Sequence, residues 1–378
     1  MTGPNAPLVT SLGLASNLGA GVVGAAAAQR AGLSRRSELP EFTVYEAGDE
    51  MEGPVIGAPI AGVTDGFMQP GLWLRLATRC LDDLIAYGAL PSARDGAFWR
   101  RAGVLWVLPD IEVQRFLWAV DDMPAFLHGI CAEPLLGLTE LAIAPAAVEL
   151  LPGGAAAAVA AAERVADLFA RTSLERVIVI ATDSWLDPLS LRSLAADHRL
   201  KSGEQPVGLC PGEASAALLL ERPSAASARA ARGEARVVAA VASPPTAPPE
   251  ADDDPHAVRL RSVEDMARRL AFAVRQTLAV AQVSEPFAGT ILLDVNGEEW
   301  RARVWGSAQS RLIDVVDFDR STPVIPAISF GDTGAASGVL GLCLATRAYA
   351  RGYAAAPRTL LCSISEGGAV GAVLLEAS

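Results

Sequence analysis

The sequence predicts an α/β fold built from two copies of one unit. Two ten-residue pieces, 212–221 and 367–376, align without a gap, and each begins at a glycine-rich turn and continues into an apolar strand. Apolar, β-branched runs of this kind are typical of strands that are covered on both faces. A helix of small residues and a further apolar strand precede each piece, at 152–171 and 177–181 in the first half and at 331–350 and 359–363 in the second.

The predicted halves are residues 1–235 and 236–378, which together form one two-lobed unit. The stretch 223–234, rich in Ala, Ser and Arg, separates them. Residues 243–255 hold prolines and acids that cannot bury apolar area, so a surface loop is expected there. The segment 262–283 has apolar residues at helical spacing, with Glu264 and Asp265 expected in its first turn.

Two further segments near the start of the chain have predictable structure. Residues 8–28 are mostly apolar, but no Lys or Arg precedes Arg30 and glycines interrupt the run, so a strand, a turn and a short helix are expected rather than a signal peptide or membrane span. Residues 42–60 read as two extended pieces around 47–53, which predicts a hairpin.

Composition excludes several classes of function. Hydrophobic residues make up 51% of the 378, which indicates a packed globule. The net charge of −12 makes nucleic acid and anionic membrane surfaces unsuitable partners. Five scattered cysteines without a CxxC pair favour a reducing, cytoplasmic compartment. With three histidines, none near a motif, neither a metal site nor a cofactor is expected.

Three motifs in order carry a resemblance to a known family. The segment 183–190, the turn Cys210-Pro211-Gly212-Glu213-Ala214 and the segment 330–338 resemble the strand end, the "PGEGA" turn and the "GHxxGAAG" helix start of the β-ketoacyl-acyl-carrier-protein synthases, within the thiolase superfamily. The resemblance covers residues 9–378. It implies a five-layer α/β/α/β/α thiolase fold of two pseudo-duplicated halves, and a homodimer or heterodimer formed through a central strand.

The family's catalytic positions hold unsuitable residues. Its condensation uses a cysteine thiolate at a helix N-terminus, and the family spacing places Ala155 there, which has no nucleophile. Its two histidines fall on Asn296 and Asp332, and its lysine falls near Ala327. An aspartate opposes a developing oxyanion rather than stabilising it. The resemblance therefore implies a relative that does not condense acyl groups, with no catalytic residue.

A polar cluster replaces the catalytic set, and its members are binding candidates. Glu298 and Asp332 could form a carboxylate pair for acid–base work, or they could be solvated acids beside a turn in which Asn296 takes positive φ. Asp332 also fits a helix N-cap. Glu366 takes the place of the bulky apolar gate in the family's "GFGG" loop, facing a ligand or solvent. Asn, Trp and Arg together suit a protein interface. The candidates are Asn296, Glu298, Trp300, Arg301, Asp332 and Glu366.

Three functions remain open. Asp294, Asn296-Gly297-Glu298, Arg301, Trp305 and Gly306 form a "DxNGE…R…WG" segment similar to that of degenerate ketosynthase-like proteins encoded beside bacterial type VI secretion effectors, which implies a protein-binding adaptor. The second function is a chain-length-factor-like partner of an active ketosynthase, which the acidic balance and the single lysine, Lys201, disfavour. The third is an enzyme with new chemistry in the old pocket.

Overall fold

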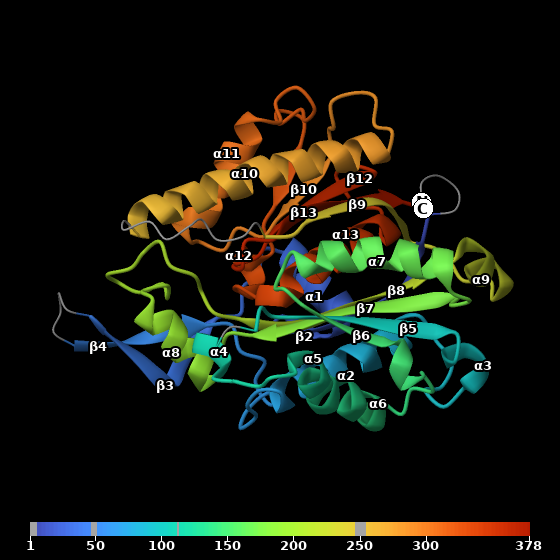
Figure 1. Ribbon diagram of the computed structural model, residues 1–378, viewed down its shortest axis with the longest axis horizontal. Coiled ribbons are helices and arrows are strands. Elements are labelled where there is room, and N and C mark those ends of the chain that lie inside the picture. Colours follow the sequence, from blue (N-terminus) through green and yellow to red (C-terminus); the bar gives the residue numbers. More distant parts are fainter. Residues whose placement is uncertain (1–5, 47–50, 112, 246–254) are drawn as a thin grey trace.

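Two layers of strands separate three layers of helices in the computed structural model, which describes residues 6–46, 51–111, 113–245 and 255–378 (Figure 1). One outer layer contains α2 (Gly71–Tyr87) and α6 (Glu133–Thr139), and the other contains α10 (Pro255–Val280) and α11 (Glu299–Ser310). Between the sheets lie α7 (Ala157–Arg171) and α13 (Ser337–Ala350). The five-layer α/β/α/β/α prediction is confirmed. Shorter helices are α1 (Gly21–Arg30), α3 (Gly96–Trp99), α4 (Val113–Phe116), α5 (Met123–Leu127), α8 (Pro188–Ala196), α9 (Pro223–Ala228) and α12 (Ala327–Phe330).

The two halves share one strand topology. The first five strands are β1 (Leu8–Ser16), β5 (Ala102–Leu108), β6 (Val148–Pro152), β7 (Arg176–Ser184) and β8 (Glu213–Glu221). The second five are β9 (Ala235–Ser243), β10 (Thr290–Leu293), β11 (Thr322–Val324), β12 (Arg358–Ile364) and β13 (Val370–Ala377). The spatial orders are β6-β5-β7-β8-β1 and β11-β10-β12-β13-β9. In each half, the second strand in chain order lies between the third and the fourth and is parallel to both. The fifth strand lies between the fourth and the first and is antiparallel to both.

A short contact joins the two sets of strands. Leu8 pairs with Arg236 and Val9 with Ala235, so β1 and β9 connect the halves through their ends alone. The repeated topology explains the two similar ten-residue pieces of the sequence, because each piece contributes the fifth strand of its half. Dividing the chain at residue 235 into two halves stays a prediction.

Most predicted elements have the expected type. The segment 8–28 forms β1, β2 (Gly19–Ala20) and α1, as expected. The position of Glu264 and Asp265 was predicted wrongly: α10 begins at Pro255, so both acids lie inside the helix, where Asp265 pairs with Arg269. Proline suits a first helical position, so the helix extends back into the expected loop. Most of that loop, residues 246–254, lies outside the described residues.

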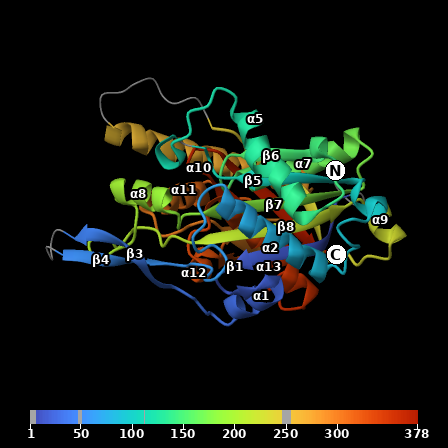
Figure 2. The same cartoon turned by 90° about the horizontal axis from the view of Figure 1, so that it is seen from below.

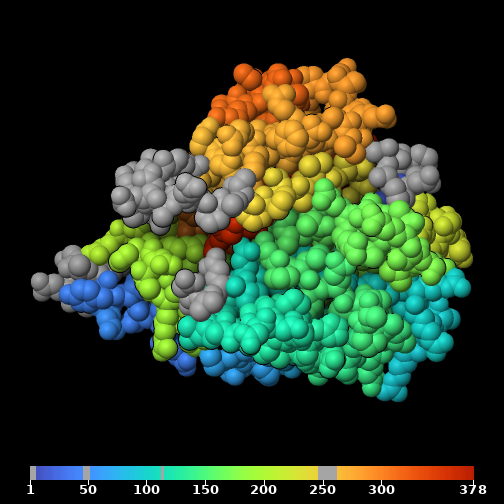
Figure 3. Space-filling view, viewed as in Figure 1, coloured from blue at the N-terminus to red at the C-terminus, as the bar shows by residue number. Residues whose placement is uncertain are grey.

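Small residues let the middle helices pack closely. A Cβ on Gly338 of α13 would lie 2.8 Å from the Cβ of Ala158 in α7, closer than side-chain carbons pack. These helices share one core with the inner faces of both sheets, while α2 and α10 each cover an outer face with a core of its own. Trp73, Trp99 and Trp106 are fully buried in the core under α2. The α10–α11 layer and the first half are separate bands in the space-filling view (Figure 3).

The predicted hairpin is present and lies at one end of the molecule. Strands β3 (Ser37–Glu46) and β4 (Met51–Gly57) pair in antiparallel fashion and extend away from the layers (Figures 1 and 2). The turn 47–50 lies outside the described residues. Val55 of β4 packs with Trp185, Leu200 and Leu209 in a small core. This core anchors the segment between α8 and β8, which contributes to the site below.

Candidate functional site

Each half caps the central helix of the other. Ser365, after β12, accepts a hydrogen bond from the N–H of Ala156 at 2.8 Å and donates one to the carbonyl of Gly153 at 2.5 Å, at the start of α7. Asp183, near the end of β7, accepts one from the N–H of Ala335 at 2.9 Å, in the turn that enters α13. The strands β7 and β12 hold equivalent positions in the two halves, so the exchange is reciprocal.

Ala155 lies at the start of α7, where the family spacing predicted it, and is 4% exposed. The cavity beside it measures about 20 Å³ and is also lined by Asp110, Trp185 and Glu366. That is room for about one water molecule, and not for an acyl chain. A methyl side chain and a water-sized cavity therefore lie at the start of α7.

The cysteines do not replace the missing nucleophile. All five are free and buried, and burial raises the pKa of Cys131 to about 12. Burial also raises the pKa of the other thiols, Cys80, Cys210, Cys343 and Cys362. A reactive cysteine needs a lowered pKa and some exposure. None of these five environments provides both.

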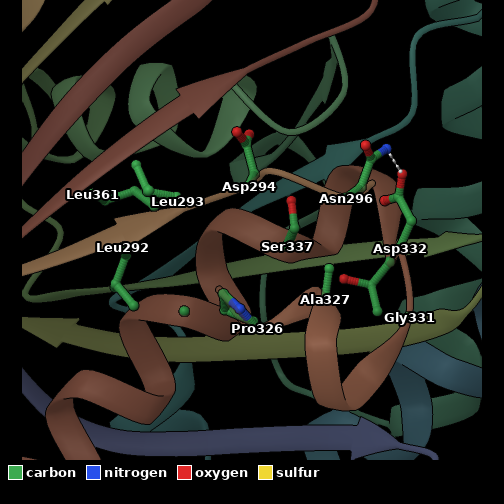
Figure 4. A pocket seen from close by; sticks show the side chains of 12 residues that line it. Leu292, Leu293, Asp294, Asn296, Pro326, Ala327, Gly331, Asp332, Ser337 and Leu361 are labelled. Atoms are coloured by element: carbon green, nitrogen blue, oxygen red, sulfur yellow. Dashed lines mark hydrogen bonds between the residues drawn. The ribbon is translucent and has the colours of Figure 1, made fainter. Parts of the chain in front are cut away.

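Asn296 and Asp332, the residues that the resemblance aligned with the family's two histidines, contact each other. The Nδ2 of Asn296 donates to Asp332 Oδ2 at 2.5 Å (Figure 4). It also donates to Glu298 Oε2 at 2.9 Å. Asp332 Oδ1 accepts from the N–H of Gly334 at 2.8 Å, so Asp332 caps the short turn before α13 rather than α13 itself. The expectation that Asn296 takes positive φ was wrong, since Gly297 has φ of +108°.

The expectation that the acids here are solvated was also wrong, since Glu298 and Asp332 are each 5% exposed. Arg199 explains how Glu298 is buried. Its Nε and Nη2 donate to the two oxygens of Glu298 at 2.7 and 3.0 Å, and its Nη1 donates to Glu366 at 3.0 Å. We call these three residues the Arg199 group. Charged residues are rarely buried unless paired, and here one guanidinium serves two carboxylates.

Arg199 sets the ionisation of the group. Burial acts to lower the pKa of Arg199, but the hydrogen bonds that it donates to Glu298 and Glu366 raise it overall. Burial acts to raise the pKa of Glu298, but Arg199 lowers it overall. Sequence reasoning missed Arg199, because it follows α8 in a segment without a motif. Only the folded chain places this first-half residue between two second-half acids.

Arg301 and Asp294 form a second layer behind the Arg199 group. Arg301 is 3% exposed, donates to the carbonyl of Ile364 at 2.7 Å, and lies 3.8 Å from the nearest carboxylate oxygens of Asp294, Glu298 and Glu366. Asp294 accepts the N–H of Ile364 at 2.7 Å, and burial raises its pKa. The Arg301 guanidinium stacks 4.7 Å from the centre of the half-buried Trp300 ring.

The Arg199 group lies between an outer cleft and the inner cavity. The cleft has a volume of about 550 Å³ and is lined by α10, α11, the segment after α8 and all three members of the group. Glu366 also lines the 20 Å³ cavity beside Ala155. A further cavity of about 10 Å³ is lined by Ala327, Asn296 and Asp332 (Figure 4). Glu366 thus lies between the large outer cleft and the small cavity beside Ala155.

The arrangement favours charge pairing over proton transfer. Both oxygens of Glu298 accept hydrogen bonds from Arg199, and its pKa is lowered, whereas a general acid at neutral pH needs a raised pKa. Within the part of the chain that the structure describes, no three His, Cys, Asp or Glu side chains gather as a metal site would require. Nor does any described helix have the length and apolar character needed to cross a membrane.

The layers and the strand topology define a thiolase fold. No family model and no curated protein matches the sequence. Solved structures do match. A type II polyketide ketosynthase, AntDE, in complex with the acyl-carrier protein AntF has 16% identity and a TM-score of 0.72, over 100% of both chains. A β-ketoacyl synthase from Burkholderia phymatum has 16% identity and a TM-score of 0.72, over 99% of this chain and 100% of that one.

The ishigamide ketosynthase/chain length factor is also similar, with 18% identity and a TM-score of 0.67, over 98% of this chain and 99% of that one. At these identities the likeness shows the fold alone. The chain therefore has a fold shared by ketosynthases and a chain length factor, and its own residues must supply the case for function.

Proposed function

We propose that this protein does not condense acyl groups and acts instead by binding a protein partner. The observation that carries the proposal is the double loss at the family's reaction centre. Ala155 supplies no nucleophile, and the Arg199 group lies between the cavity beside Ala155 and the outer cleft. Either change alone would impair acyl transfer, and together they leave a scaffold whose fold persists without that chemistry.

The partner class that we propose is an effector of a bacterial type VI secretion cluster, with the protein as a cytoplasmic adaptor. The segment 294–306 supports this, because its residues resemble those of degenerate ketosynthase-like proteins of such clusters. In the fold, the segment supplies Glu298 and Trp300 to the cleft and Arg301 behind it. The five free, buried cysteines are in keeping with a reducing compartment.

We propose that the protein also forms a dimer through β6. This strand pairs with β5 on one side and, among the described residues, has no strand on its other side. Leu150 and Leu151 are half-buried and Pro152 is exposed. An uncovered apolar edge strand is a template for pairing with a second chain.

A second candidate is a chain-length-factor-like partner of an active ketosynthase. The similarity to a ketosynthase/chain length factor structure supports it, because that role does not need a nucleophile in this subunit. The charge of the cleft counts against it. Four carboxylates and only two guanidiniums line the cleft, and this excess of negative charge would repel an acidic carrier protein. A repurposed enzyme using Glu298 and Asp332 is the least supported function, because Glu298 is held as a carboxylate by Arg199.

Affinity purification of the tagged, full-length protein from its own host, with mass spectrometry of the bound proteins, tests the proposal. We expect secretion-system or effector proteins, with recovery reduced by Trp300→Ala and unchanged by Trp118→Ala, which alters a half-buried tryptophan outside the cleft. Recovery of a cysteine-bearing ketosynthase or an acyl-carrier protein would instead support the chain-length-factor function.

A further inference from the structure

The outer cleft is built from three separate parts of the chain. Its floor is the Arg199 group, one wall is α10 with Val263 and Met266, and another is α11 with Glu299, Trp300 and Arg303. The segment after α8 closes the third side with Asp197 and Val207. Its volume, about 550 Å³, falls in the range of ordinary ligand sites.

The charges that line the cleft are unbalanced. Four carboxylates, from Asp197, Glu298, Glu299 and Glu366, face two guanidiniums, from Arg199 and Arg303. Both guanidiniums are already engaged, because Arg199 pairs with Glu298 and Glu366, and Arg303 pairs with Glu299 at 2.6 Å. Among the lining residues that the structure describes, the carboxylates therefore exceed the guanidiniums by two, and both guanidiniums are already paired.

Apolar surface lies next to this charge. Val207 is 50% exposed on one side, while Met266 and Val263 lie on the α10 side. Trp300 of α11 is half-buried, follows Glu299 in the chain and also lines the cleft. Tryptophan combines a large apolar face with attraction for cations. The cleft therefore offers both a charge partner and an apolar partner within one space.

We infer that the cleft binds an extended, basic segment of the protein partner, in which arginine or lysine alternates with apolar residues. The cations of such a segment would lie toward Asp197 and Glu299, and its apolar side chains toward Val207 and Trp300. An anionic group, such as a phosphate, meets the same acids as like charges and is disfavoured. The inference rests on the proposed protein-binding function and specifies which surface and which chemistry serve it.

Fluorescence anisotropy with three labelled octapeptides tests the inference at about 0.15 M salt, where long-range attraction is screened. The peptides are Gly-Ser-Leu-X-Leu-X-Ser-Gly with X as arginine, glutamine or glutamate, so that charge alone differs. We expect the arginine peptide to bind the full-length protein at least about fivefold more tightly than the glutamine peptide, and the glutamate peptide not to bind measurably. Equal binding of the arginine and glutamine peptides would overturn the inference.

Matched variants locate the binding site. The double variant Asp197→Asn/Glu299→Gln removes two exposed charges from the cleft and should weaken the arginine peptide about 3- to 10-fold. The control, Asp121→Asn/Asp319→Asn, removes two exposed charges that do not line the cleft, and should change binding less than twofold. An equal loss of affinity in both double variants would mean that the peptide is attracted by the net charge of the protein alone, which would contradict a binding site in the cleft.

Two further outcomes keep this inference separate from the proposed function. Spermidine has the charge without apolar side chains, so displacement of the peptide by an equal concentration of spermidine would overturn the peptide assignment. Acyl transfer to the protein, measured independently by mass spectrometry, would refute the non-condensing function while leaving the peptide result unchanged. If the protein carries no acyl adduct and binds the arginine and glutamine peptides equally, the cleft inference alone would be refuted.

Discussion

The starts of the two central helices are equivalent in position and different in chemistry. A neutral hydroxyl, from Ser365, caps the start of α7. A carboxylate, from Asp183, caps the turn before α13, and Arg115 pairs with it at 2.6 Å. Asp183 and Arg115 are 1% and 4% exposed. The two halves thus exchange caps in the same way, but one of the two caps belongs to an ion pair that is buried in the core.

The halves also differ in what they contribute to the site. Around Ala155 the first half supplies Asp110, Arg115 and Asp183. The loops after β10 and β12 of the second half supply Glu298 and Glu366. Arg199 is the first-half residue that ties these acids together. Both halves therefore supply polar residues to the site, and Arg199 of the first half pairs with two acids of the second.

Breaking the charged cap should have the largest effect. Arg115→Met leaves the Asp183 carboxylate buried without its cation, and we expect the free energy of unfolding to fall by about 3–5 kcal/mol. Adding Asp183→Asn should recover part of the loss. Urea denaturation at pH 7 measures both. The control is Arg94→Met, which breaks an exposed ion pair with Glu140. Equal losses for Arg115→Met and Arg94→Met would mean that the buried ion pair at the cap contributes no more than an exposed one, which would contradict the account.

Removing the neutral cap should have a smaller effect. Ser365→Ala leaves the N–H of Ala156 without its acceptor, and we expect a loss of about 1 kcal/mol, as for other helix caps. The control is Ser310→Ala, which removes an exposed hydroxyl that bonds its own helix. Thermal unfolding distinguishes them. A loss for Ser365→Ala as large as that for Arg115→Met would mean that the two caps are energetically equivalent.

The smallest expected effect is a dependence on pH in the Arg199 group. Because Arg199 lowers the pKa of Glu298 in the folded protein, Glu298 contributes stability that is present above its unfolded pKa, about 4.3, and is lost as the pH falls toward the lower folded value. Glu298→Gln should therefore destabilise at pH 7, with the deficit shrinking below about pH 4. The exposed neighbour variant Glu299→Gln is the comparison, and a pH-independent deficit for Glu298→Gln would refute the assignment.

The sequence predicted the fold better than it predicted the site. Residues 212–221 and 367–376 share a pattern because each forms the same strand of a repeated unit, and such local patterns survive in the sequence. The family resemblance singled out Asn296 and Asp332 but did not predict that they contact each other, as they do in the fold. Solvation of Glu298 was predicted wrongly, because its burial depends on Arg199, which is 99 residues away and lies in no motif. Long-range pairing of this kind leaves no local signal.

The most direct test of the central claim is acyl transfer, followed by intact-protein mass spectrometry. The wild-type protein and the Ala155→Cys variant are incubated with malonyl- and acyl-loaded carrier protein, beside an active ketosynthase as positive control. We predict no acyl adduct on either, because the first lacks a nucleophile and the second remains closed by the Arg199 group. An adduct on Ala155→Cys alone would show that the entrance is open, and an adduct on the wild-type protein would contradict the non-condensing function.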